Sequence, residues 1–217
     1  KARQTKGKAK GREPQTPTPG PRTQDQYNFT DPDSRIMKNS TDDGFDQHYN
    51  VQAAVTQDSM LIVATSLSNH PNDKREVEPT VDALSPKLGQ PQAAALDTGF
   101  FSEANIRFLE ERNIDPYIAT GRDSHQRDVA TLLAGVPTPP PPDASPTEKM
   151  AYKLRTEIGQ AIYGLRKSTI EPVIGIIKEV LGFRQFSLRG LTAVAGEWSL
   201  VCLAYNLKRI HVLHTAC

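Results

Sequence analysis

The chain has 217 residues, of which 37% are hydrophobic and 17 are proline, and its formal net charge is +1. This length is enough for one folded domain, and the low apolar and high proline content predict disordered stretches around a smaller core. We expect no signal peptide and no membrane-spanning helix, because the sequence has no run of about 18 apolar residues and no apolar stretch behind its basic start.

Charges are distributed unevenly along the chain. Residues 1–12 hold six basic and no acidic residues, residues 31–148 hold nine basic and nineteen acidic, and residues 149–217 hold ten basic and four acidic. A basic C-terminal part beside an acidic central part suits a protein that binds a polyanion and metal ions, but an ordinary uneven surface is the simpler explanation of charge alone. Cys202 and Cys217 form neither a disulfide framework nor a zinc-binding spacing, which favours a reducing, intracellular setting.

The N-terminal half predicts an arm followed by a hairpin. Residues 1–29 have the composition of a disordered basic arm or linker, and because the chain begins with Lys1 we expect a fragment. Turn-forming residues dominate 28–37 and 42–46. Alternating apolar residues then predict strands at 49–55 and 60–67, joined by a tight turn at 57–59.

The following elements predict an α/β domain. We expect a helix over 74–84, and then a β-α-β unit made of a buried strand at 93–97, a helix over 102–112 and a parallel strand at 115–120. A Pro-rich insert at about 136–146 separates this unit from three helices, at 148–166, 169–181 and 191–213. The order predicts a mixed sheet flanked by helices, and no internal repeat is evident.

Asp97 is the first candidate for chemistry. It follows the apolar run of residues 93–96, where Gly99 turns the chain, and ligand sites of parallel α/β sheets lie beyond the carboxyl ends of strands. A carboxylate at that place can bind Mg²⁺. A turn or helix-capping aspartate explains the pattern equally well.

Glu171 is the second candidate. It lies in an apolar helical segment among basic and aromatic residues: Tyr163, Arg166, Lys167 and Lys178. Such cations can bind phosphates. The competing interpretation is a capping box formed by Ser168 and Glu171, with Pro172 in the first turn of a helix that begins there.

The segment of residues 183–190 interleaves aromatic and basic side chains. We expect Phe183 and Phe186 to lie in the core, and we leave phosphate contacts open for Arg184 and Arg189. The five histidines have no metal-binding spacing and are assigned no role.

Several of these motifs together resemble bacterial insertion-sequence transposases with a DDE domain. The resemblance covers about Asn28 to the C-terminus and rests on residues 30–38, 49–55, 95–100, 166–178, 182–191 and 197–207. It includes the tyrosine–arginine–glutamate–lysine motif of this group, on Tyr163, Arg166, Glu171 and Lys178. Arg166 is one residue further from Glu171 than that motif expects, so Arg166 and Lys167 compete for the arginine's role.

The resemblance implies an RNase H-like fold, over residues 30–217, and an active site of three acids and two Mg²⁺ ions that cut DNA and join it to a target. Asp97 would be the second acid and Glu171 the third. The first sheet strand and its acid are missing from this chain, since Asp31 and Asp33 belong to a turn. We therefore expect a truncated, inactive or nearly inactive fragment.

The resemblance also implies partners and a location. DNA, as insertion-sequence ends and target, would be the partner, the complete protein would be a homodimer, and it would lie in the bacterial cytoplasm with the nucleoid. Two alternatives remain open. One is a DNA-binding remnant without catalysis, and the other is a metal-dependent nuclease of related fold.

Overall fold

The computed structural model describes residues 20, 27–38, 44–121 and 138–215. Most of the predicted arm at 1–29 lies outside these residues. The strands are β1 (Arg35–Lys38), β2 (Phe45–His48), β3 (Asn50–Val55), β4 (Ile62–Ser68), β5 (Ala93–Leu96) and β6 (Asp115–Ile118). The helices are α1 (Val77–Asp82), α2 (Glu103–Glu111), α4 (Pro146–Arg155), α5 (Glu157–Gly175) and α6 (Leu191–Thr215), with short 3₁₀ turns η1 (Asp73–Arg75), η2 (Pro86–Leu88) and η3 (Thr98–Phe100) and a π-helical turn η4 (Ile176–Val180).

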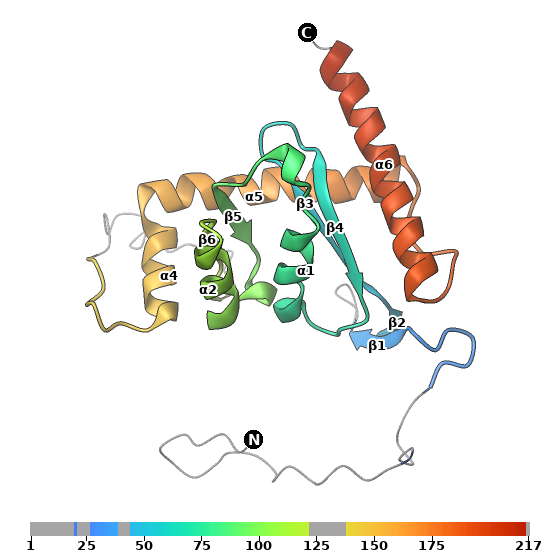
Figure 1. The fold of residues 1–217 in the computed structure, drawn as a ribbon, viewed down its shortest axis with the longest axis horizontal. Helices are drawn as coiled ribbons and strands as arrows, with labels where there is room; N and C mark the ends of the chain where they lie inside the picture. The colour runs from blue at the N-terminus through green and yellow to red at the C-terminus, as the bar shows by residue number, and fades with distance from the viewer. Residues whose placement is uncertain (1–19, 21–26, 39–43, 122–137, 216–217) are drawn as a thin grey trace.

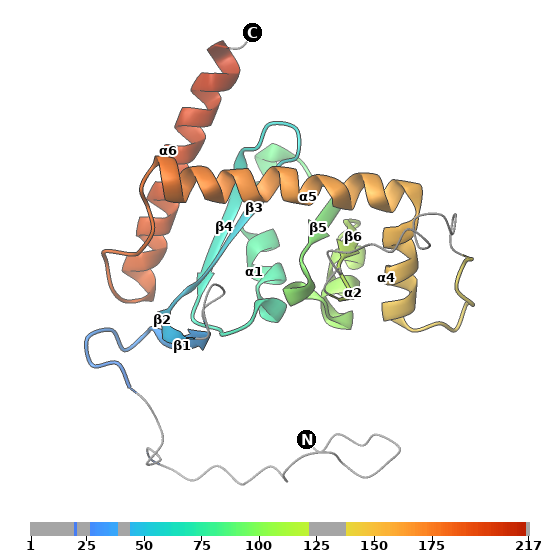
Figure 2. The same ribbon diagram turned by 180° about the vertical axis from the view of Figure 1, so that it is seen from behind.

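The strands lie between two layers of helices, as expected for an α/β fold. Figure 1 shows α1 and α2 on the near side of the strands, and Figure 2, from behind, shows α5 crossing the other side. In both views β5 and β6 lie towards α4, whereas β3 and β4 lie towards α6. The described residues thus form a mixed α/β structure in which one long helix spans both groups of strands.

The described strands form three two-stranded sheets rather than one mixed sheet. The predicted hairpin is present as antiparallel β3 and β4, and the predicted β-α-β unit is present as parallel β5 and β6 with α2 between them. The hairpin of β1 and β2 is not predicted, because both strands are short and largely exposed and the sequence around them shows turn residues.

The predicted N-cap of α2, Ser102, is confirmed. Ser102 accepts a hydrogen bond from the backbone N–H of Asn105, at 3.1 Å, and α2 begins at the next residue. The predicted helix at 74–84 is divided between η1 and α1. Between them Glu76 is both the C-cap of η1 and the N-cap of α1.

The predicted break between the first and second of the three C-terminal helices, at residues 167–168, is wrong. The chain turns at Thr156, whose hydroxyl caps the N–H of Gly159, and α5 then continues through Glu171 and Pro172. Gly159 allows this corner, since a Cβ there would lie 1.9 Å from the carbonyl oxygen of Lys153. The Ser168 hydroxyl donates to the Leu165 carbonyl, so it does not form the predicted capping box.

The Pro-rich insert is shorter at its C-terminal end than predicted. Residues 138–145 form no helix or strand, but α4 begins at Pro146 with a capping box between Ser145 and Glu148. Residues 136 and 137 lie outside the described residues. No described helix is long and apolar enough to span a bilayer.

The buried side chains form two clusters. One joins β4, the C-terminal half of α5, η4 and α6, and it includes Val173, Trp198 and Tyr205. Phe183 and Phe186 pack against it, which confirms that these rings belong to the core. The other cluster joins α1, α2, β6 and α4.

Asp31 and Asp33 connect the first turn to the start of α6. Asp31 accepts hydrogen bonds from the Tyr49 hydroxyl at 2.6 Å and from the Gly190 N–H at 3.2 Å, and Asp33 accepts one from the Leu191 N–H at 2.9 Å. Both carboxylates therefore have structural partners. Burial, together with the nearby Asp31 carboxylate, raises the pKa of Tyr49 to about 12.

Candidate active site

Asp97 occupies the predicted position directly after β5. Its side chain is 59% exposed, and one carboxylate oxygen accepts the backbone N–H of Thr98 at 2.8 Å, which makes Asp97 the N-cap of η3. The capping interpretation is therefore correct. It does not exclude a second role, because the other oxygen is directed to α5.

Arg166 is the residue of α5 that contacts Asp97. Its Nη1 lies 3.6 Å from Oδ2 of Asp97, and its side chain is only 16% exposed. The guanidinium also lies over the ring of Tyr163, at 5.6 Å from its centre. The structure thus joins Tyr163, Arg166 and Asp97 at the end of β5.

Glu171 lies on a different face of α5. It is exposed and stands five residues after Arg166, which corresponds to about 7.5 Å along the helix axis and about 140° around it. Lys167, one turn before Glu171, is exposed, as is Lys178 in η4. The predicted motif is therefore divided between an inward pair, Tyr163 and Arg166, and an outward group, Lys167, Glu171 and Lys178.

Arg184 and Arg189 lie in the loop between η4 and α6. Both are exposed, and Arg184 forms an ion pair with Glu179. Glu197 of α6 accepts the backbone N–H groups of Ser187 and Leu188 and holds this loop. The loop therefore presents its basic side chains outward while its aromatic rings are buried.

Asp73 of η1 lies against Gly99, two residues after Asp97. A Cβ on Gly99 would lie 2.6 Å from Oδ2 of Asp73, so any larger residue would displace that carboxylate. The other oxygen of Asp73 accepts hydrogen bonds from Asn50 at 2.9 Å and Gln52 at 3.1 Å. Sequence reasoning missed the contact of Asp73 with Gly99, because it depends on the packing of η1 against η3.

A cavity of about 670 Å³ lies beside Asp97 and Arg166. Its sides are residues 51–57 of β3 and the following turn, and residues 91–97 around β5. Residues of α1 and α5 line its remaining walls, and most of the lining is apolar.

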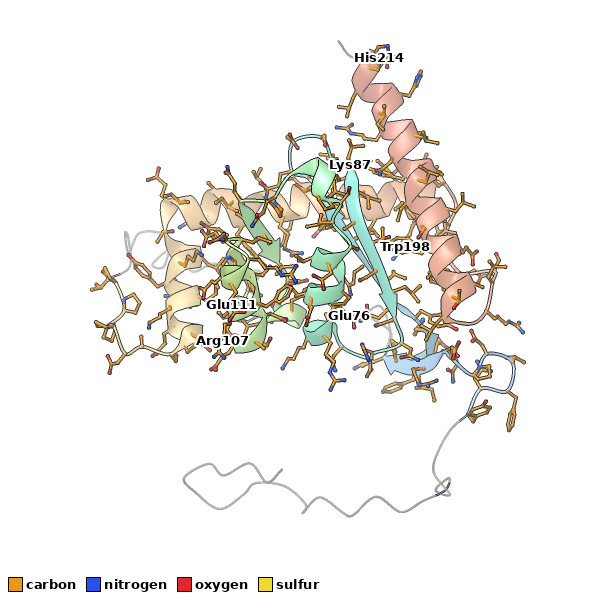
Figure 3. All side chains as sticks on the ribbon, viewed as in Figure 1. Glu76, Lys87, Arg107, Glu111, Trp198 and His214 are labelled. Atoms are coloured by element: carbon orange, nitrogen blue, oxygen red, sulfur yellow. The ribbon has the colours of Figure 1, made fainter. Side chains whose placement is uncertain are left out.

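Two polar atoms that border this cavity lack partners. Among the described residues, Glu76 Oε2 and Arg166 Nε are the buried side-chain atoms without a hydrogen-bond partner, and Glu76 is 1% exposed. Its other oxygen lies 2.8 Å from Nδ1 of His70. Figure 3 shows Glu76 at the start of α1 and Trp198 on α6, and Trp198 also lines the cavity. Sequence reasoning missed Glu76, because an acidic residue at the start of a helix is common and does not indicate a site.

The described residues do not by themselves fit a two-metal site. No group of three or more His, Cys, Asp or Glu residues in the described ranges could hold a metal ion. The charged group next to Asp97 is the cation of Arg166. A metal site at Asp97 would need at least one more acid than the described arrangement provides.

Comparison with known proteins supports the resemblance over the C-terminal part. A family model described as "Transposase DDE domain" matches residues 141–211. No curated protein and no solved structure matches the chain. The matched region contains α4, α5, η4 and most of α6, and therefore Arg166 and Glu171. It does not include the described strands or Asp97, which precede it in the chain. Over residues 141–211 the chain is thus similar to the DDE domain of transposases.

Proposed function

We propose that the chain is part of a DDE transposase that binds, cuts and joins DNA in its complete form, with Asp97 and Glu171 as two of its three acids. The observation that carries the proposal is the contact of Arg166 with Asp97. It connects the region that matches the transposase domain to the acid predicted at the end of β5.

The proposal includes an RNase H-like fold without its first strand. The third acid would come with that strand, and Mg²⁺ would then neutralise and orient the reacting phosphate. Glu171 would have to approach Asp97 from its exposed face of α5. The chain alone should therefore be inactive in strand transfer.

The basic residues would have two kinds of role. Lys167, Lys178, Arg184 and Arg189 are exposed and would bind DNA phosphates, which position the protein without reading sequence. Arg166 and Tyr163 lie further in and would contact only DNA that reaches Asp97. Of the two residues competing for the arginine's role, Arg166 would hold Asp97 and Lys167 would bind phosphate.

DNA binding is tested with a fluorescent duplex in a salt series. We expect affinity to fall steeply with salt, and Lys167→Ala and Lys178→Ala each to reduce the salt slope by about one. Lys87→Ala is the control, because Lys87 is an exposed lysine on η2, outside the proposed group of DNA-binding residues. Salt-insensitive binding, or an equal effect of Lys87→Ala, would contradict the proposed surface.

Catalysis is tested with an insertion-sequence end, a target plasmid and Mg²⁺. The expected result is little or no strand transfer by residues 1–217. Robust activity that survives Asp97→Ala would refute the assignment of Asp97 and of the family chemistry. A protein that cuts without joining, judged by its product ends, would be a nuclease.

A DNA-binding remnant is the second candidate function. It is favoured by the lack of an acid cluster in the described residues. Asp97→Asn should then leave DNA affinity unchanged or slightly higher, since it removes a negative charge. A loss of affinity with Asp97→Asn would exclude simple phosphate binding.

We also propose a homodimer in the bacterial cytoplasm, at the nucleoid. Four exposed apolar residues recur along α6 at the spacing of a helix-pairing seam: Leu200, Leu203, Leu207 and Ile210. Light scattering after size exclusion should give twice the chain mass, and Leu203→Glu should halve it. A monomeric wild-type chain would contradict this part of the proposal.

A further inference from the structure

We propose that three carboxylates position the basic loop of residues 183–190 for contact with DNA. They belong to Asp31, Asp33 and Glu197. By fixing the backbone of the basic loop they set the directions of its two arginines. The inference rests on the proposed DNA binding, and it gives the acids of the first turn a role outside catalysis.

Glu197 holds the middle of the basic loop from within α6. Its Oε1 accepts the backbone N–H of Ser187 at 2.9 Å, and its Oε2 accepts that of Leu188 at 2.9 Å. Because Glu197 follows the start of α6 at Leu191 by six residues, this is a tertiary contact rather than a capping box. Hydrogen bonds to a charged acceptor are stronger than neutral ones, so the pair fixes the loop backbone here.

The two acids of the first turn hold the end of the basic loop. Asp31 accepts the N–H of Gly190 at 3.2 Å, and Asp33 accepts that of Leu191 at 2.9 Å. Figures 1 and 2 show the start of α6 beside the segment that leads into β1. The loop is therefore held at two places, by acids that are far apart in the sequence.

Aromatic packing fixes the inner side of the basic loop. The rings of Phe183 and Phe186 meet edge to face, with their centres 5.3 Å apart, and both pack against the cluster that contains Trp198. The exposed side chains of the loop include Arg184 and Arg189. A loop that is ordered before it binds loses less conformational entropy on binding, which favours affinity.

The two acids near the basic loop have opposite expected effects on DNA binding. Glu179 is exposed and forms an ion pair with Arg184, so it would compete with a phosphate for that guanidinium. Glu197 carries the same charge, but it accepts hydrogen bonds from the loop backbone. Electrostatics alone predicts that the loss of either charge strengthens DNA binding, whereas positioning predicts that the loss of Glu197 weakens it.

The test measures the affinity of residues 1–217 for the fluorescent duplex at one salt concentration. Glu197→Ala should weaken binding by at least about fivefold, although it removes a negative charge. Glu197→Gln loses the same charge but keeps one acceptor, so it should recover part of the affinity. Asp33→Ala should also weaken binding. Glu179→Ala is the matched control and should bind as tightly as the wild type or more tightly.

A double-mutant cycle tests whether Glu197 acts through the arginines. In a chain that carries both Arg184→Ala and Arg189→Ala, Glu197→Ala should not weaken binding further, because the basic loop then has no basic side chain to position. A loss caused by general destabilisation would appear in both backgrounds. Circular dichroism confirms that each variant folds.

Limited digestion with trypsin examines the basic loop without DNA. Trypsin cleaves after arginine and lysine, so Arg184 and Arg189 are cleavage sites within the loop. Cleavage there should be faster in Glu197→Ala and Asp33→Ala than in the wild type. Glu179→Ala should be cleaved at the wild-type rate, because Glu179 contacts an arginine side chain and not the loop backbone.

The outcomes separate this inference from the proposed function. A wild-type chain without salt-dependent DNA binding would refute both. If the wild type binds DNA and Glu197→Ala binds as tightly or more tightly, the positioning role alone is refuted. A loss that Glu179→Ala reproduces, or one that persists without the two arginines, has the same meaning. Unchanged trypsin cleavage of Glu197→Ala would show that this carboxylate does not hold the loop.

Discussion

At the scale of single residues, the contact of Arg166 with Asp97 shows that the residues of the predicted motif do not all face the same site. The helix directs Arg166 inward and Glu171 outward, although the two are close in sequence. Nη1 of Arg166 lies 3.6 Å from Oδ2 of Asp97, so the guanidinium restrains the position of that carboxylate. Arg166 thus positions Asp97. Glu171, on the outward face of α5, needs a further group to bring it into a site with Asp97.

Tyr49 provides a residue-scale test of the contact between the first turn and α6. Removing its hydroxyl leaves the buried Asp31 with fewer donors, so Tyr49→Phe should lower the unfolding free energy by about 1–3 kcal/mol. Urea denaturation measures this. Tyr27→Phe is the control, because Tyr27 is 62% exposed. Equal stability of wild type and Tyr49→Phe would show that the contact contributes nothing.

The pH dependence of stability tests the raised pKa of Tyr49. Its pKa is raised to about 12 in the folded chain, mainly by burial, from an ordinary value of 10.0. A raised pKa means that its contribution to stability is complete below pH 10 and is lost as pH rises through about 12. The stability difference between wild type and Tyr49→Phe should therefore shrink from pH 10 to 12. A difference that stays constant would contradict the raised pKa.

Gly99 is the other residue whose identity the structure explains. Gly99→Ala would place a methyl group 2.6 Å from Asp73, displace that carboxylate from Asn50 and Gln52, and cost about 1–3 kcal/mol. Gly164→Ala in α5 meets no atom within 4 Å and should raise stability by about 0.5–1 kcal/mol. Thermal unfolding of both variants checks the contrast. Similar melting temperatures would refute the predicted crowding at Gly99.

At the scale of elements, the continuity of α5 determines which residues share a face. Pro172 lies inside the helix, where it has no N–H to donate to the carbonyl of residue 168. Pro172→Ala should therefore stabilise the chain, by up to about 3 kcal/mol. If a helix began near Glu171, proline would be favourable there and the same change would be neutral or destabilising. Urea denaturation distinguishes these outcomes.

The sequence predicts elements better than their joints. The strands at 49–55 and 93–97 and the Ser102 cap are local patterns of alternation, apolar content and turn chemistry, and the structure confirms them. The corner at Thr156 depends on a close contact between Gly159 and the Lys153 carbonyl, which no local pattern shows. The site divides in the same way. Asp97 is found from its strand end, whereas Arg166 and Glu76 join it only through tertiary packing.

At the scale of the whole molecule, two core clusters meet across a cavity. One is formed with α6 and contains Trp198, and the other is formed with α2 and α4. The described β3–β4 and β5–β6 pairs belong to separate sheets, so the two parts are coupled mainly through α5 and α1. Two cores that are coupled through few elements should unfold with weaker cooperativity.

The chain's one tryptophan makes this measurable. Trp198 fluorescence reports the cluster around α6, whereas circular dichroism at 222 nm reports helices of both parts. In a urea titration of residues 1–217 the two probes should give different midpoints, because each part can unfold while the other persists. Coincident curves would show a single cooperative unit, in which α5 and α1 couple the two clusters. Ala95→Phe, which fills the cavity, should bring the two midpoints closer, whereas Ala161→Phe, at an exposed position of α5, should leave them apart.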